Sequence, residues 1–209
     1  MDLTTPLSSV IPTLEAQALT VLVRSRAPLS GLRIAQLAST GSRSGIKLGL
    51  DRLVASGLVR AEQHGSAIMY TLNRDHVLAD GVISMAAATA RLRQRLRDRL
   101  AGWDVPCVHA SLFGSAARGD GETHSDIDVL VVKPADVAGD DPTWQGQLAQ
   151  LEEDVARWTG NTLSLFETTT GDLLAAAQRH EPVVQSWRED AIQLAGEPLA
   201  SLLRAEVSA

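Results

Sequence analysis

Two short apolar stretches, each joined to a polar turn, constrain the fold of this chain more than any other feature. Val108–Phe113 reads as a β-strand and runs directly into Gly114-Ser115. After a polar loop, Asp126 and Asp128 alternate with apolar residues at the start of a second strand that continues to Val132. Successive side chains of a strand point to opposite faces, so the two aspartates share one face. The pattern predicts that the turn glycine and the carboxylate pair converge in space.

These residue types suit a nucleoside triphosphate bound with a metal ion. Glycine at position 114 lets the backbone come close to a phosphate. Ser115, at the start of a helix, offers a hydroxyl and free N–H groups where the helix dipole favours an anion. Two carboxylates on one strand face suit Mg²⁺, and one or two ions there would bridge the phosphates. The alternative is a structural turn with a solvated acidic strand end, which the apolar neighbours of the acids disfavour.

The combination Leu-Phe-Gly-Ser-x-x-x-Gly at 112–119 and Ser-Asp-x-Asp at 125–128 resembles the signature of minimal nucleotidyltransferases of the polymerase-β superfamily. The resemblance covers about residues 105–170. It implies in-line attack on the α-phosphate of an NTP, transfer of the NMP to an acceptor, and Mg²⁺ or Mn²⁺ as cofactor. It assigns catalysis and metal binding to Asp126 and Asp128. It assigns nucleotide binding to Gly114, Ser115, Arg118, which is expected to brace the loop, and Ser125, which is expected to orient the aspartates.

The same resemblance leaves the acceptor and the activity open. Relatives of the minimal type often act as antitoxins that modify a partner toxin, so a toxin-like protein or an RNA is an expected acceptor. The family usually supplies a third carboxylate from a later strand, which here matches Thr162–Phe166. Ser164 takes the place of that acid, and Glu167 has the wrong parity for the same face unless a bulge re-aims it. The alternative to an enzyme is a regulator whose degenerate domain binds nucleotide or serves as a scaffold.

The first third of the chain has a helix–turn–helix pattern followed by a hairpin. Three amphipathic helices are expected at 13–25, 30–38 and 42–56, with Ser30 and Ser42 or Ser44 as N-caps. Two strands are expected at 57–62 and 67–72, around a turn at 64–66. Over residues 10–77 this order resembles winged-helix regulators of the ArsR/MarR type. The resemblance implies DNA contacts from the second helix of the pair, with protein contact as the alternative. The contacting residues would be Ser42, Arg43, Ser44 and Lys47, with Arg52 and His64 beyond them.

Charge is distributed unevenly along the chain. Up to Val77 there are eight basic and five acidic residues, from Leu78 to Leu100 five and two, and from Ala101 onward six and eighteen. A basic helix is expected over 80–100, with a leucine stripe that packs either on the neighbouring domain or on the same helix of a second subunit, which would form a homodimer. The basic half suits DNA, and the acidic half needs a metal ion to hold phosphates.

The expected organisation is α+β, with a winged helix-turn-helix domain at 1–77, a connector helix at 78–100 and a nucleotidyltransferase domain with a mixed sheet and helices at 101–209. Later helices are expected near Val183–Leu194 and Pro198–Val207. The four tryptophans are expected to pack in the core or at its edge. A single cysteine, no leader pattern and no apolar stretch long enough to span a membrane favour a cytoplasmic protein without membrane partners.

Overall fold

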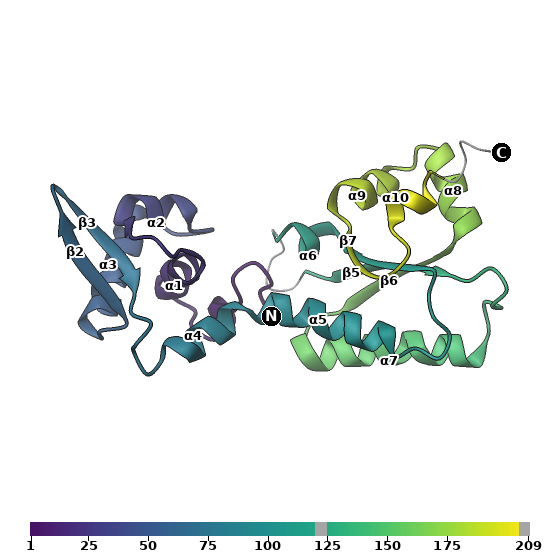
Figure 1. The fold of residues 1–209 in the computed structure, drawn as a ribbon, viewed down its shortest axis with the longest axis horizontal. Coiled ribbons are helices and arrows are strands. Elements are labelled where there is room, and N and C mark those ends of the chain that lie inside the picture. The colour runs from purple at the N-terminus through teal and green to yellow at the C-terminus, as the bar shows by residue number, and fades with distance from the viewer. Residues whose placement is uncertain (120–124, 205–209) are drawn as a thin grey trace. The chain divides into compact units, whose positions relative to one another are not determined.

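The computed structural model describes residues 1–119 and 125–204, and it divides into two compact units (Figure 1). One unit contains Asp2 and Thr4–Thr89, and the other contains Met1, Leu3 and the chain from Ala90 onward. None of the described helices is long and apolar enough to cross a membrane. Each unit has its own hydrophobic core.

The N-terminal unit is built from short helices whose caps follow the sequence. The Ser30 hydroxyl accepts a hydrogen bond from the N–H of Arg33 at 3.2 Å, and the Ser42 hydroxyl accepts one from Gly45 at 3.1 Å. Both predicted caps are therefore confirmed. The helices of this unit are the 3₁₀ turn η1 (Pro6–Ser9), α1 (Leu14–Arg24), α2 (Gly31–Leu37), α3 (Arg43–Ala55) and α4 (Ala79–Ala86).

A three-stranded antiparallel sheet completes this unit. The predicted hairpin is present as β2 (Val59–His64) and β3 (Ala67–Leu72), joined by a two-residue turn. The first strand of the hairpin starts two residues later than predicted, because Gly57 has a φ of +78° and ends the preceding helix. A third strand, β1 (Leu29–Ser30), was not predicted; it pairs with β3 in the order β1-β3-β2.

One of the two glycines that lower the helix propensity of α3 has a packing function. A Cβ atom on Gly45 would lie 2.5 Å from Cδ1 of Leu14. A Cβ atom on Gly49 would lie 3.4 Å from the backbone nitrogen of Glu15. The missing side chain of Gly45 leaves room for Leu14 of α1, whereas a Cβ atom on Gly49 would make an ordinary contact.

The C-terminal unit has a four-stranded mixed sheet in the order β6-β5-β4-β7. Its central strands β4 (His109–Phe113) and β5 (Ile127–Lys133) are antiparallel and almost entirely buried. β6 (Leu163–Thr169) runs parallel to β5, and β7 (Ile192–Gly196) runs antiparallel to β4. The expected α+β class with a mixed sheet is confirmed for this unit.

Helices cover both faces of this sheet (Figure 1). α5 (Ala88–Ala101) and α7 (Pro142–Thr159) lie on the face that contains Ile127, Val129 and Val131. The opposite face, with Phe113 and Leu130, packs against the second group of helices. That group consists of α8 (Thr170–Gln178), α9 (Pro182–Asp190) and α10 (Leu199–Leu202). The short helix α6 (Gly114–Arg118) follows β4 directly.

The predicted helix over 80–100 is two helices, α4 and α5, which separate at Ala87. The residues around the break are good helix formers, so packing and not propensity causes it. Val82 of α4 is buried in the N-terminal core, whereas Leu92, Leu96 and Leu100 of α5 are buried in the C-terminal core. The leucine stripe therefore packs within its own unit.

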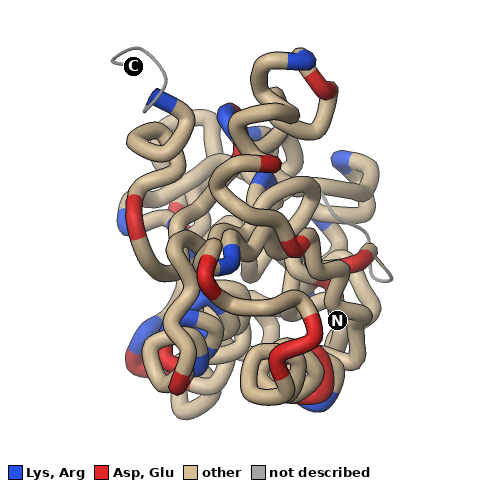
Figure 2. The backbone as a smooth tube through the Cα atoms, turned by 90° about the vertical axis from the view of Figure 1, so that its right-hand side faces the viewer, with Lys and Arg blue, Asp and Glu red and all other residues tan. Residues whose placement is uncertain are grey.

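The arginines of α5, which form a cluster of basic positions in Figure 2, mostly contact the same unit. Arg99 forms an ion pair with the fully buried Asp154 of α7, which also pairs with Arg157. Arg95 lies over the Trp158 ring at 5.5 Å, and Arg93 donates to the carbonyl of Ala117 at 3.4 Å. Most of this basic face is therefore anchored to its own domain.

Two further differences from the sequence-based expectation lie in the C-terminal unit. The predicted helix 183–194 ends at Asp190, and Ile192–Gly196 forms β7 because its residues pair with β4. The longest helix, α7, was not predicted, although Asp141 caps it, Pro142 begins it and Gly160 ends it at a φ of +72°. Of the predicted helix 198–207, the structure describes α10, while residues 205–209 lie outside the described part.

Candidate functional site

The two halves of the sequence motif meet where β4 ends and β5 begins. Phe113, the last residue of β4, is paired in register with Asp128. Gly114 follows with a φ of +66°, a conformation that glycine adopts readily. A Cβ atom at this position would lie 2.6 Å from Oδ2 of Asp128. The glycine therefore serves both the turn and the close approach of the backbone to a carboxylate, and the predicted convergence is observed.

The two aspartates form a pair of neighbouring negative charges. Asp126 is exposed and directly precedes β5, and Asp128 is half-buried two residues later. Burial raises the pKa of Asp128, the Asp126 carboxylate raises it further, and the Arg118 guanidinium lowers it. In the part of the chain that the structure describes, neither carboxylate accepts a hydrogen bond or forms an ion pair. Among the described side chains, the Arg118 guanidinium is the one that offsets the charge of the pair.

This donor set fits a divalent cation that is shared with a phosphate. Mg²⁺ commonly binds through one or two carboxylates and completes its coordination with water and substrate phosphates. Asp126 and Asp128 supply such a pair of hard oxygen ligands. Among the described residues, no group of three or more His, Cys, Asp or Glu side chains could form a complete metal site. The pair fits a cation that arrives with a nucleotide better than a cation held by protein alone.

Arg118 and Ser125 are held in place by residues distant in the sequence. The Arg118 guanidinium pairs with Asp190 of α9 at 2.5 Å, and Asp190 also accepts from the Ser186 hydroxyl at 3.2 Å. The carbonyl of Ser125 accepts a hydrogen bond from the Asn161 amide at 3.1 Å. Arg118 thus has a bracing contact, and Asn161 fixes the backbone that precedes the acid pair. Ser115, the second residue of α6, is half-buried.

The sequence could not have identified Asp190 and Asn161 as partners of the motif. Asp190 lies 72 residues beyond Arg118, and Asn161 lies 36 residues beyond Ser125. Neither residue belongs to a local pattern with the motif, so only the tertiary fold reveals these contacts. The loop 120–124, which the motif includes, lies outside the described residues.

The strand that should supply a third carboxylate is β6. Ser164 is paired in register with Asp128, which places a hydroxyl where an acid was expected. Glu167 pairs with Val131 and lies on the other face, where its carboxylate accepts a hydrogen bond from Nε1 of Trp144 at 2.9 Å. No bulge interrupts the β5–β6 register, so Glu167 is not re-aimed toward the acid pair.

The predicted contacts of the N-terminal unit lie at the start of α3. Arg43, Ser44 and Lys47 are exposed, and Arg43 and Lys47 line a groove of about 470 Å³ together with hairpin residues such as Ser66 and Ile68. Lys47 forms an ion pair with Asp51 at 2.5 Å. The exposed Ser42 uses its hydroxyl as the helix cap.

The two more distant candidates differ in their surroundings. Arg52 pairs with Glu15 of α1, so it braces the helix pair instead of facing outward without a partner. His64 is exposed at the tip of the hairpin, beside Glu62.

Comparison with known proteins supports one part of this site. Residues 91–175 match a family model described as "Nucleotidyltransferase domain". The match includes the Gly114 turn, the acid pair and the strand with Ser164. It confirms the polymerase-β-like resemblance for this segment, whereas the winged-helix resemblance stays a prediction. No curated protein and no solved structure matches the chain.

Proposed function

We propose that this chain, in which residues 91–175 form a nucleotidyltransferase domain, transfers a nucleoside monophosphate from an NTP to an acceptor. The observation that carries the proposal is the position of Gly114 directly against the Asp128 carboxylate. A phosphate near this turn is within reach of both aspartates. Two adjacent carboxylates that accept no hydrogen bond repel each other, so we assign them the function of binding a cation.

Each residue of the motif has a definite task in this reaction. Gly114 leaves room for the phosphates, and Ser115 offers a hydroxyl to them. Arg118, fixed by Asp190, places a positive charge beside the acid pair and keeps the loop in position. A Mg²⁺ or Mn²⁺ ion held by Asp126 and Asp128 supplies the charge that stabilises the transferred phosphoryl group. The acceptor attacks the α-phosphate in line, and pyrophosphate leaves.

The transfer is tested with radiolabelled NTPs, Mg²⁺ or Mn²⁺, and total cell RNA or protein as acceptor. Label should enter RNA or a protein with the wild-type chain and disappear with Asp126→Ala and Asp128→Ala. Asp136→Ala is the matched control, because Asp136 is an exposed acid in the loop after β5. Equal labelling by all four proteins would show that the acid pair has no catalytic function.

A second function is favoured by the environment of β6. Ser164 occupies the register position opposite Asp128, and Glu167 is bound to Trp144 on the other face. Without a third acid, the group that activates the attacking hydroxyl is missing from this strand. The alternative is thus a regulator whose domain binds a nucleotide without turnover. Magnesium-dependent nucleotide binding that Asp128→Ala abolishes, together with no label transfer to any acceptor, would identify this case.

We further propose that the N-terminal unit binds DNA as a winged helix, with α3 in the major groove and the β2–β3 hairpin as the wing. The support is the groove between α3 and the hairpin, with Arg43 and Lys47 at its edge. The Lys47–Asp51 pair is exposed and screened by water, so Lys47 can exchange it for a phosphate at little cost.

A gel-shift titration against the DNA upstream of the gene tests this interface. Arg43→Ala and Lys47→Ala should each weaken DNA binding by about tenfold. Each should also reduce the slope of log affinity against log salt concentration by about one, because one phosphate contact is lost. Arg26→Ala is the matched control, because Arg26 is exposed but lies outside both α3 and the hairpin. If the two α3 variants bind as tightly as the control, α3 is not the recognition helix.

A further inference from the structure

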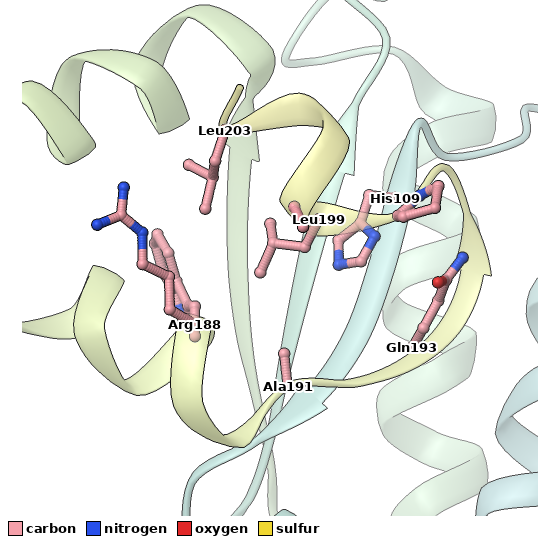
Figure 3. A pocket seen from close by; sticks show the side chains of 9 residues that line it. His109, Arg188, Ala191, Gln193, Leu199 and Leu203 are labelled. Carbon is pink, nitrogen blue, oxygen red and sulfur yellow. The ribbon is translucent and has the colours of Figure 1, made fainter. Parts of the chain in front are cut away.

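The C-terminal unit has a pocket of about 270 Å³ at the end of β4 opposite to Gly114. It is enclosed by β4, the end of α9, β7 and α10 (Figure 3). His109 of β4 lines the pocket, and Leu199 of α10 and the following Leu203 form part of its apolar wall. Except for His109, every lining residue lies beyond residue 175, where the family match ends. The pocket is therefore built largely by the segment that follows the matched domain.

His109 presents an unsatisfied hydrogen-bond acceptor at this pocket. The side chain is 1% exposed, and its Nδ1 donates to the carbonyl of Glu197 at 2.7 Å. Burial lowers the pKa of the imidazole, which favours the neutral ring. With the proton on Nδ1, Nε2 carries a lone pair, and no described residue donates to it. A buried acceptor without a donor is costly, so a ligand hydroxyl that reaches Nε2 from the pocket would be stabilised.

Two neighbouring residues of α9 supply the complementary donors. Trp187 lines the pocket, is 5% exposed, and has no acceptor for its Nε1–H among the described residues. Arg188, labelled in Figure 3, also lines the pocket but is exposed, and it forms no ion pair within the described chain. An N–H donor and a cation on two consecutive lining residues favour a carboxylate.

We propose that this pocket binds a small organic acid with an apolar body and a hydroxyl group. The hydroxyl donates to Nε2 of His109, the carboxylate accepts from Trp187 and Arg188, and the apolar body contacts Leu199 and Leu203. The volume limits the ligand to roughly ten non-hydrogen atoms, since drug-sized ligands need about 300–1,000 Å³. Gly196 helps to form the site, because its φ of +72° lets the chain approach Val108 and brings Glu197 to His109.

Calorimetry on the full chain without nucleotide tests this proposal independently of the transferase activity. The probes are 4-hydroxybenzoate, benzoate and 4-hydroxybenzyl alcohol. We expect 4-hydroxybenzoate to bind, and each of the others to bind about tenfold more weakly, because benzoate lacks the hydroxyl and 4-hydroxybenzyl alcohol lacks the charged carboxylate. Arg188→Gln should weaken the binding of both carboxylates by about fivefold and leave the binding of the alcohol unchanged. Added salt should reduce this difference in affinity between the wild-type chain and the variant.

Two further variants make the result specific. His109→Phe should remove the preference for 4-hydroxybenzoate over benzoate. If His109→Phe prevents folding because His109 is buried, the exposed Arg188→Gln variant still tests the pocket. Arg179→Gln is the control, since Arg179 is exposed, pairs with Glu181 and does not line the pocket. The proposal is overturned if no probe binds at millimolar concentration, or if neither the hydroxyl nor Arg188 affects the affinity.

Discussion

Replacing Gly114 with alanine perturbs the site at a single, well-defined point. The alanine must adopt a φ of +66°, which costs about 1–2 kcal/mol for a residue with a Cβ atom. The new methyl group would lie 2.6 Å from Oδ2 of Asp128, whereas an ordinary contact requires at least 3.4 Å. The carboxylate therefore has to retreat by about 0.8 Å from its position in the site.

A displacement of this size has a large effect on a group that holds the reacting phosphates. A misplacement of about 1 Å commonly costs about 100-fold in rate, so Gly114→Ala should reduce NMP transfer by about that factor. The assay is initial-rate label transfer with Mg²⁺, combined with urea unfolding to measure stability. If the domain binds nucleotide without turnover, the effect of Gly114→Ala is measured instead as a rise in the Kd for the nucleotide in the presence of magnesium.

Gly160→Ala separates the backbone cost from the displaced carboxylate. Gly160 ends α7 with a φ of +72°, and a Cβ atom there would have no neighbour within 4 Å. Both variants should lose about 1–2 kcal/mol of unfolding free energy, but only Gly114→Ala should lose transfer. The reasoning is refuted if Gly114→Ala is as destabilised as Gly160→Ala and yet transfers NMP at the wild-type rate.

Three further expectations follow from other parts of the molecule. Ser164→Asp places an acid opposite Asp128, so it should raise the affinity for Mg²⁺ in a metal titration, and an unchanged affinity would place Ser164 outside the metal site. The Arg52 hydrogen bond lowers the pKa of Glu15 to about 2, so the pair stabilises the fold above pH 4.5 and less as the pH falls toward 2. Because Arg52 is more than half exposed, Glu15→Gln should cost only about 1 kcal/mol at pH 7, and urea unfolding should show this cost vanishing near pH 2. Burial raises the pKa of the Cys107 thiol to about 11, so a colorimetric thiol reagent should label the native protein at least about 100-fold more slowly than the unfolded chain.

Local signals in the sequence were sufficient for much of the fold. The serine caps of α2 and α3, the hairpin turn at Gly65 and the alternation around Asp126 each act over a few residues, and each was predicted. The convergence of Gly114 with Asp128 was also predictable, because a turn and a strand start connect them. The caps of α7, Asp141 and Gly160, are equally local signals, although this helix was not predicted.

Features that depend on tertiary packing could not be predicted in this way. The strand β7 has no strong alternation of its own and forms because β4 offers an unpaired edge. The break between α4 and α5 occurs because their apolar residues serve two different cores. Ser164 could be aligned with the missing acid from sequence, but the contact that holds Glu167 on the other face required knowledge of Trp144 in α7.

α9 connects the motif with the pocket at His109 by two physical routes. Its Asp190 pairs with Arg118, and its Trp187 ring packs edge-to-face on Phe113 at 6.1 Å, directly before Gly114. A ligand that contacts Trp187 therefore acts on a helix that holds both the backbone and the charge beside Asp128. Ligand binding can shift the nucleotide site only by the difference in its affinity for two positions of α9. Since such coupling is reciprocal, a nucleotide that draws Arg118 toward its phosphates would change the affinity of the pocket by the same factor.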